Sequence, residues 1–220
     1  MVGVAGHARF RGSAPGGAPG IQPVSAGRSR SAQRARSVYG EQVDPVLVVL
    51  RGNSAAGKST LAGALQTELG QGTANIGQDY FRRRILREHD VAGGANIGLI
   101  AAAARHCLRS GWNVVLEGIF PAAHYREMLR DLAAWHGGRS RFYYLAVELA
   151  ESQRRHARRE WSSQVPPEQL REWYLTDDVL DLAGERVLSA HRRTDELLAD
   201  ILADLGPVPP PTPEQVANAL

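Results

Sequence analysis

The feature that most constrains the fold is a strand–loop–helix pattern around the only lysine of the chain, Lys58. Residues 52–59, Gly-Asn-Ser-Ala-Ala-Gly-Lys-Ser, match GxxxxGK[ST], the phosphate-binding P-loop. The apolar run 46–50 before the loop predicts a buried parallel strand, and residues 59–69 after it predict a helix that ends at Gly70. A fortuitous Gly/Ser-rich turn is the alternative, and the flanking pattern argues against it.

Of the 26 lysine and arginine residues, the other 25 are arginines. Lysine therefore occurs only at the motif position where a compact ammonium must reach the β- and γ-phosphates of a nucleotide. In this motif the backbone N–H groups surround the phosphates, and the hydroxyl of Ser59 is the expected ligand of Mg²⁺. We therefore predict ATP and Mg²⁺ as cofactors. The predicted nucleotide-binding residues are Gly52, Asn53, Ser54, Ala55, Ala56, Gly57, Lys58, Ser59 and Thr60.

Length and charge predict one domain with tails. Residues 1–40 carry six arginines and no acid, whereas the remaining 180 residues carry 20 basic and 23 acidic groups, which argues against a nucleic-acid-binding core. We expect a disordered Arg/Gly/Ala-rich tail over 1–42, a domain over 43–206 and a C-terminal tail over 207–220, with an extended segment over 206–211. The first tail also has the composition of an organelle transit peptide, an alternative that stays open.

The single cysteine, Cys107, excludes an intrachain disulfide and favours the cytoplasm. It lies in a predicted buried helix, so a small core residue is a better interpretation than a nucleophile. No apolar run approaches the ~20 residues that span a bilayer, so no membrane association is predicted. The sequence leaves monomer and homodimer open.

Further strands are predicted at 73–77, 113–116, 141–147 and 186–188, and helices at 80–89, 96–110, 122–136, 150–160, 167–175 and 193–204. Strands that alternate with helices indicate a five-stranded parallel sheet with helices on both faces, an α/β three-layer sandwich. The ends of such strands meet at one edge, where ligands bind. Residues just after each strand are therefore the candidates for chemistry.

Asp79 follows the second predicted strand and is the candidate catalytic base, because a carboxylate there can take the proton of a substrate hydroxyl. The alternative is that Asp79 only caps the helix after it. Nearby Arg83 is a candidate ligand for an anionic group of the substrate. Glu117, in Leu-Glu-Gly-Ile-Phe after the third strand, is the candidate second Mg²⁺ ligand or an acceptor contact, with a simple Glu-Gly turn as the alternative.

After the fourth strand, four arginines form i,i+4 pairs on one predicted helix, which we interpret as a lid around 150–165. Clustered guanidinium groups favour phosphate as a partner, and Arg154, Arg155 and Arg158 are the candidate catalytic residues. The alternative is pairing with Glu151, Glu160 and solvent.

The blocks GNSAAGKST, QDYF and VVLEGI resemble those of uridine kinases, within the P-loop small-molecule kinases of the nucleoside-monophosphate-kinase type. The resemblance covers roughly residues 45–205 and implies a P-loop kinase fold with Asp79 as base, Glu117 near Mg²⁺ and residues 154–159 as a mobile lid. Uridine kinases carry a long nucleoside-binding insertion between the aspartate and Glu-Gly blocks. Here Glu117 follows Asp79 by 38 positions, a layout that looks more like chloramphenicol phosphotransferase, gluconate kinase or the zeta-toxin kinases.

We therefore predict an ATP-dependent phosphotransferase that acts on a hydroxyl of a small molecule such as an antibiotic, a nucleoside or a sugar. The predicted acceptor-side residues are Asp79, Tyr80, Arg83, Glu117 and the pair Tyr125 and Arg126. The wall of the acceptor pocket is expected over 80–100, 119–130 and 161–180, where two interpretations stay open for Trp161, Trp173 and Tyr174: stacking on a ring of the acceptor or filling the core. Two alternatives stay open: an RNA or polynucleotide 5′-hydroxyl kinase that uses the arginine-rich tail as a tether, and a nucleotide-binding module without transfer.

Overall fold

The central strand, β1 (Val46–Arg51), is buried along its whole length in the computed structural model, which describes residues 44–158, 166–182, 184–208 and 210–217. Because side chains alternate across a strand, Val46, Val48 and Leu50 belong to one core cluster, and Leu47 and Val49 belong to the other. The continuous apolar run of β1 is thus explained by a sheet that is covered on both faces.

All five strands are parallel, in the order β2-β3-β1-β4-β5. The bounds of the other four are Thr73–Gly77 for β2, Asn113–Gly118 for β3, Arg139–Ala146 for β4 and Glu185–Ser189 for β5. Since β1 lies in the middle, its last residue, Arg51, pairs with Gly118 of β3 and Tyr144 of β4. The P-loop therefore starts at the centre of the sheet edge.

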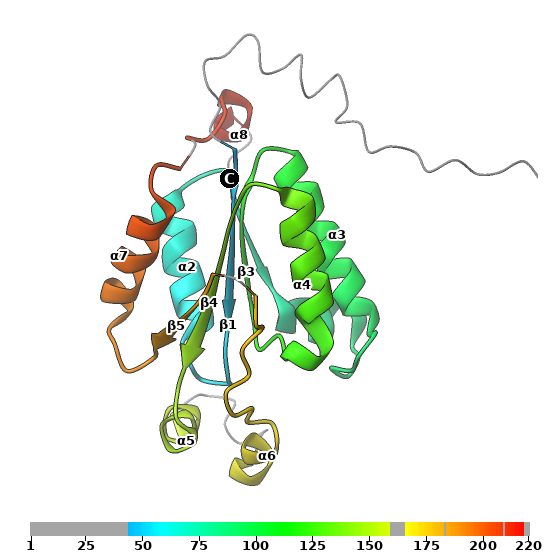
Figure 1. Cartoon of the computed structure of the whole chain (residues 1–220), viewed down its shortest axis with the longest axis vertical. Helices are drawn as coiled ribbons and strands as arrows, with labels where there is room; N and C mark the ends of the chain where they lie inside the picture. The colour runs from blue at the N-terminus through cyan, green and yellow to red at the C-terminus, as the bar shows by residue number, and fades with distance from the viewer. Residues whose placement is uncertain (1–43, 159–165, 183, 209, 218–220) are drawn as a thin grey trace, which may run out of the picture. The chain divides into compact units, whose positions relative to one another are not determined.

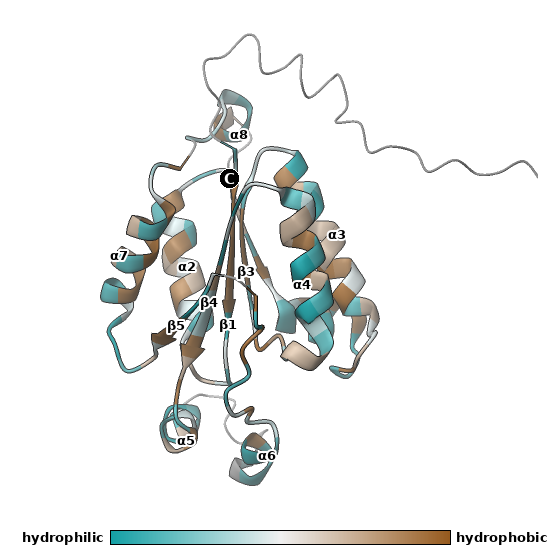
Figure 2. Ribbon diagram, viewed as in Figure 1, coloured by the Kyte–Doolittle hydropathy of each residue, from teal (hydrophilic) through white to brown (hydrophobic). Residues whose placement is uncertain are grey.

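Helices α2 (Lys58–Leu69) and α7 (Thr194–Leu205) cover one face, and α3 (Ala95–Arg109) and α4 (Ala122–His136) cover the other, as Figure 1 shows. In Figure 2 the strands between these layers are mostly brown, while the helices carry teal stripes on their outer sides. This arrangement confirms the predicted three-layer α/β sandwich.

Two short helices, α5 (Leu149–Ala157) and α6 (Pro167–Glu172), lie beyond the carboxyl ends of the strands (Figure 1). Of the two, α5 lies in the predicted lid over 150–165, of which residues 159–165 lie outside the described residues, and α6 follows it. Both helices end three residues before the predicted limits of 160 and 175. The predicted tail over 1–42 also lies outside the described part of the chain.

Two local predictions were wrong. The helix expected at 80–89 is a π-helix, η1 (Tyr80–Leu86), that ends because Arg87 takes a left-handed conformation with φ of 55°.

The region expected to be a C-terminal tail, 207–220, contains α8 (Pro213–Ala217). Thr212 and Gln215 form a reciprocal capping box, in which Gln215 N–H donates to Thr212 Oγ1 and Thr212 N–H donates to Gln215 Oε1. The Thr-Pro-Glu-Gln sequence carries that signal.

Candidate functional site

The P-loop turns sharply at the end of β1 because its backbone takes conformations that suit glycine. Gly52 has a φ of 142°, and a Cβ there would lie 2.5 Å from the carbonyl oxygen of Leu145. Gly57 has a φ of 98°, and Ala55 has a φ of 58°. Within the described residues no side chain caps α2 and no acid lies in its first turn, which leaves its N–H groups available for an anion.

Lys58, the first residue of α2, has only 8% of its surface exposed. Its Nζ donates a hydrogen bond of 2.8 Å to the backbone carbonyl of Asn53, so the ammonium spans the loop from one side to the other. A phosphate bound inside the loop would meet this ammonium together with the N–H groups of α2. The cradle thus has the charge and the donors that the sequence motif predicts.

Ser59 and Glu117, the two predicted metal ligands, lie together although they are 58 positions apart. The Ser59 hydroxyl donates to Glu117 Oε2 at 3.0 Å. Parallel pairing of β1 with β3 brings Glu117 to this edge, and Gly77 faces it on β2, where a Cβ would lie 2.8 Å from Oε1. The Glu-Gly sequence is therefore more than a turn, because it places a carboxylate beside the P-loop.

These two oxygen donors fit Mg²⁺. In the described part of the chain there is no group of three or more His, Cys, Asp or Glu side chains that could hold a metal on its own. Mg²⁺ is usually bound through one or two protein oxygens together with substrate phosphates and water. A hydroxyl and one carboxylate next to a phosphate cradle are the donor set that this coordination needs.

Asp79 lies two residues after the end of β2, and its side chain does not cap η1. Its backbone is right-handed helical, and its side chain makes no capping bond. Instead Oδ1 accepts hydrogen bonds from Arg82 Nη2 at 3.0 Å and from Arg83 Nε at 3.3 Å, and the side chain is 58% exposed. The capping alternative is therefore excluded as the role of this carboxylate, which remains accessible to a substrate.

A cavity of about 140 Å³ joins these groups at the sheet edge. The P-loop and the start of α2 contribute Ser54, Ala55, Gly57, Lys58 and Ser59 to its lining. Neighbouring elements contribute Asp79, Arg83, Glu117, Ile119, His156 and Trp173. The structure thus brings the predicted phosphate, metal, base and anion-binding residues into one cavity.

Three predicted acceptor-side residues, Tyr80, Tyr125 and Arg126, lie outside the cavity lining. Tyr80 is 62% exposed and packs edge-on against Phe81, and Arg126 donates to the carbonyl of Val179. The sequence places Tyr80 beside Asp79, but adjacent residues on a helix point in different directions.

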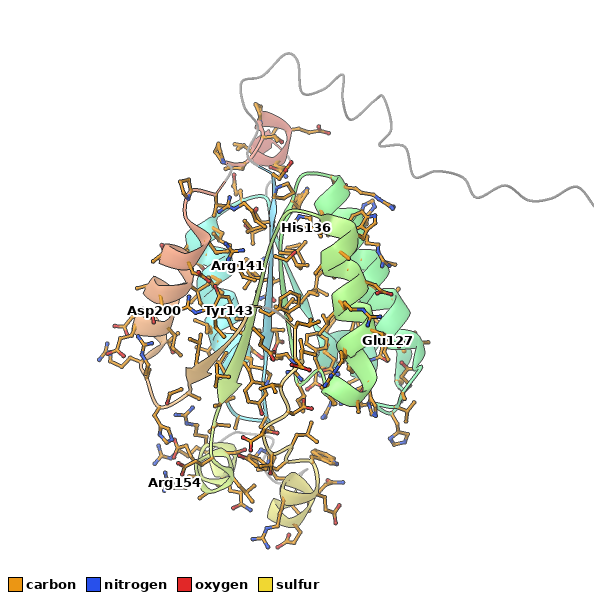
Figure 3. All side chains as sticks on the ribbon, in the orientation of Figure 1. Glu127, His136, Arg141, Tyr143, Arg154 and Asp200 are labelled. Carbon is orange, nitrogen blue, oxygen red and sulfur yellow. The ribbon has the colours of Figure 1, made fainter. Side chains whose placement is uncertain are left out.

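The predicted catalytic arginines of the lid do not line the cavity either. Arg154 and Arg155 both donate to the carboxylate of Glu151, and Arg155 also donates to the carbonyl of Ala190 (Figure 3 labels Arg154 on α5). Arg158 is an exposed residue at the end of α5. The pairing with Glu151 that was the alternative is the arrangement observed, and a role of these arginines at the phosphates stays a prediction.

These arginines lie outside the cavity because of the way α5 is oriented about its own axis, with another side of the helix toward the P-loop. Ser152 and His156, four positions apart, are buried, and Ser152 Oγ donates to the P-loop carbonyl of Ser54 at 2.9 Å. His156, not an arginine, is the α5 residue that lines the cavity. His156 was not among the predicted site residues, and the only sequence signal for it is the i,i+4 spacing from the small polar residue Ser152.

Trp173 and Ile119 also line the cavity, and both lie in the ranges expected for its wall. Trp173 lies at the P-loop because Leu175, two residues later, is anchored there: Asn53 Nδ2 donates to the carbonyl of Leu175. Asn53 Nδ2 also donates to the hydroxyl of Tyr144 in β4. Burial raises the pKa of Tyr144 to about 12, so this hydroxyl stays protonated.

The sequence pattern of the AAA domain family matches residues 47–175, more than half of the chain, and spans the P-loop, Asp79, Glu117 and α5. The chain belongs to the AAA domain family. No curated protein is similar enough in sequence to be matched with it.

Among solved structures, this AAA domain is similar to the APS kinase CysC of Mycobacterium tuberculosis in complex with AMPPNP and APS, with 19% identity and a TM-score of 0.58 over 74% of this chain and 98% of that one. A sugar kinase from Janibacter sp. has 20% identity and a TM-score of 0.58 over 74% and 96% of the two chains. A gluconokinase from Sinorhizobium meliloti has 20% identity and a TM-score of 0.53 over 74% and 93%.

These similarities show that the chain has the fold of P-loop small-molecule kinases, as the sequence predicted. They also cover nearly the whole of each of those chains. None of the helices in the described residues combines the length and the apolar character that a bilayer crossing requires.

Proposed function

We propose that this protein transfers the γ-phosphate of MgATP to a hydroxyl group of a small molecule. The observation that carries the proposal is the single cavity that holds Lys58, the Ser59–Glu117 pair and Asp79. A nucleotide-binding module needs the first three residues but has no use for an accessible carboxylate facing the phosphate cradle. The solved relatives named above, two of which are called sugar kinase and gluconokinase, support the same class of reaction.

In the proposed reaction, the P-loop N–H groups bind the phosphates, and Lys58 exchanges the carbonyl of Asn53 for phosphate oxygens. Ser59 and Glu117 would hold Mg²⁺, which neutralises charge on the phosphates when bound. Asp79 accepts the proton of the acceptor hydroxyl as that oxygen attacks phosphorus. Arg82 remains hydrogen-bonded to Asp79 and orients its carboxylate.

The acceptor side of the cavity combines Arg83 with Ile119 and Trp173. Arg83 can leave Asp79 for an anionic group of the acceptor, since the contact between them is exposed. The lid arginines Arg154 and Arg155 would have to exchange Glu151 for phosphate when the lid closes, which excludes water from the cavity.

The test is transfer of labelled γ-phosphate to a panel of sugars, nucleosides, antibiotics and a 5′-hydroxyl oligonucleotide. We expect Asp79→Asn to lower the rate about 10²–10⁴-fold with ATP binding retained. Asp131→Asn, which changes an exposed carboxylate on α4, is the matched control.

A full rate in Asp79→Asn would exclude the base assignment. Labelling of the oligonucleotide alone would favour the polynucleotide kinase. Normal ATP binding without any transfer or hydrolysis would favour the binding module.

A further inference from the structure

A cluster of polar side chains adjoins Asp79 and is centred on the hydroxyl of Tyr125 in α4; its members are the buried Gln78, Asn96 and Tyr125 and the half-buried Asp90. This hydroxyl accepts hydrogen bonds from Gln78 Nε2 at 2.8 Å and from Asn96 Nδ2 at 2.6 Å, and it donates to Asp90 Oδ1 at 2.8 Å. Tyr125 and Asn96 are fully buried. Burial, and then the bond to Asp90, raises the pKa of Tyr125, so the hydroxyl keeps the proton that it donates. All its hydrogen-bonding capacity is used.

The cluster holds Gln78 in a single orientation. Gln78 Oε1 accepts a hydrogen bond from the N–H of Phe120 at 3.1 Å, while Nε2 donates to Tyr125 and to Asp90 Oδ2. A flipped amide would turn its NH₂ group toward the N–H of Phe120 and its oxygen toward the Asp90 carboxylate. Both contacts would be repulsive, so each end of the amide is bound by a partner that the other end cannot use.

Gln78 connects this cluster to the two acids of the cavity. It precedes Asp79 in the chain, and it lies against Gly118, the residue after Glu117: a Cβ on Gly118 would be 2.5 Å from Gln78 Oε1. The side chain thus fills the space between the ends of β2 and β3. Its position sets where Asp79 stands relative to Glu117.

A second connection reaches Asp79 from the same loop between η1 and α3 that carries Asp90. Arg82 donates through Nη2 to Asp79 Oδ1 and through Nη1 to the carbonyl of Glu88 at 3.4 Å. Glu88 in turn accepts the N–H of Asn96 at 2.6 Å, which anchors this loop to the start of α3. Arg82, which binds the Asp79 side chain, and Gln78, which precedes Asp79, are therefore both hydrogen-bonded to residues of the loop 88–96.

We propose that Tyr125 and Asp90 are positioning residues for phosphoryl transfer, which act through Gln78 to hold the carboxylate of Asp79 at the acceptor hydroxyl. This inference rests on the proposed function. Neither side chain lines the cavity, so we expect neither to contact a nucleotide or an acceptor bound there. Their removal should therefore lower kcat and leave the KM for MgATP unchanged.

The test compares Tyr125→Phe with Tyr143→Phe. Tyr143 is also buried and donates its hydroxyl to a carboxylate, Asp204 Oδ2, at 2.6 Å, but it faces α7 on the other side of the sheet (Figure 3). Both variants delete one buried hydroxyl, so both should lower the Tm. Because a small displacement of a reacting group is costly, we expect Tyr125→Phe alone to lower kcat about tenfold or more.

The decisive measurement is a double-mutant cycle with Asp79→Asn, which uses ATP and either the acceptor found in the panel or water. If Tyr125 acts through Asp79, Tyr125→Phe should have little further effect on kcat in the Asp79→Asn protein. An equal loss in both backgrounds, or a loss matched by Tyr143→Phe, would overturn the inference while leaving the proposed function intact. Absence of turnover in the unsubstituted protein, or a full rate in Asp79→Asn, would overturn the proposed function and this inference with it.

Discussion

Asn53 of the P-loop and Leu175, 122 positions later, hold each other through two hydrogen bonds. Asn53 Nδ2 donates to the carbonyl of Leu175 at 2.8 Å, and the N–H of Leu175 donates to Asn53 Oδ1 at 2.9 Å. The same Asn53 presents its own carbonyl to Lys58. The residue that follows the first glycine of the P-loop therefore joins the phosphate cradle to the segment that carries Trp173.

Arg51 should be the largest single electrostatic contributor to stability. It is fully buried at the end of β1, where its guanidinium pairs with Asp178 at 2.6 Å and Glu185 at 3.0 Å and donates to the carbonyl of Phe120. Removing one partner of a buried ion pair leaves the other charges unpaired, so Arg51→Met should cost about 3–5 kcal/mol in urea unfolding. Arg130→Met, which breaks an exposed pair with Asp131, should cost less than about 1 kcal/mol. Equal losses would contradict this account.

The Ser59–Glu117 pair predicts a specific metal requirement. Ser59→Ala and Glu117→Gln should each raise the Mg²⁺ concentration at half-maximal ATP turnover about tenfold or more. Ser59→Ala removes the hydroxyl oxygen that would bind the metal, and Glu117→Gln removes the negative charge of the carboxylate beside it. Thr67→Ala is the control, since its hydroxyl bonds to Gly63 within the same helix. A Mg²⁺ titration of ATP turnover measures this, and unchanged curves for both variants would exclude the metal assignment.

Gly52 should tolerate no side chain. Because its φ is 142° and a Cβ would lie 2.5 Å from the carbonyl oxygen of Leu145, Gly52→Ala should lower the free energy of unfolding by about 2–4 kcal/mol. Gly98 lies on the exposed side of α3, where a methyl group would point into open space, so Gly98→Ala should instead raise stability by about 0.5–1 kcal/mol. Chemical denaturation measures both, and a stable Gly52→Ala protein would contradict the loop geometry.

His136 should make stability depend on pH. Burial lowers its pKa from the ordinary value of 6.5. Its Nε2 lies 3.1 Å from the carbonyl of Pro45 and its Nδ1 lies 3.0 Å from Ser140 Oγ, so the neutral ring donates from Nε2 and accepts at Nδ1. Because the unfolded chain binds this proton more tightly, the contribution of His136 to stability is present above pH 6.5 and is lost as the pH falls toward the lowered pKa.

The measurement is the free energy of unfolding between about pH 5 and pH 8. We expect His136→Gln to flatten the slope of stability against pH in the window just below 6.5. An identical slope in both proteins would show that other groups cause it.

The parts of the site that could be predicted from the sequence are those that short-range patterns encode. The P-loop and Asp79 each lie just after a strand, and parallel strands end at one edge, so their proximity follows from the fold class. Glu117 could be predicted for the same reason. The acceptor side could be predicted only in part: Arg83 lines the cavity as expected, whereas Tyr80 and Arg126 do not, because proximity in the sequence does not determine where a side chain points.

By itself the sequence determined the alternation of strands and helices, the phosphate cradle and the chemistry of its single lysine, because glycine spacing and apolar runs act over a few residues. Only the tertiary structure decided which face of α5 meets the P-loop, that Arg51 is buried against Asp178 and Glu185, and that Tyr125 reaches Gln78. These contacts join residues 47 to 134 positions apart. Their formation depends on how whole helices rotate and pack against the sheet, which no local pattern specifies.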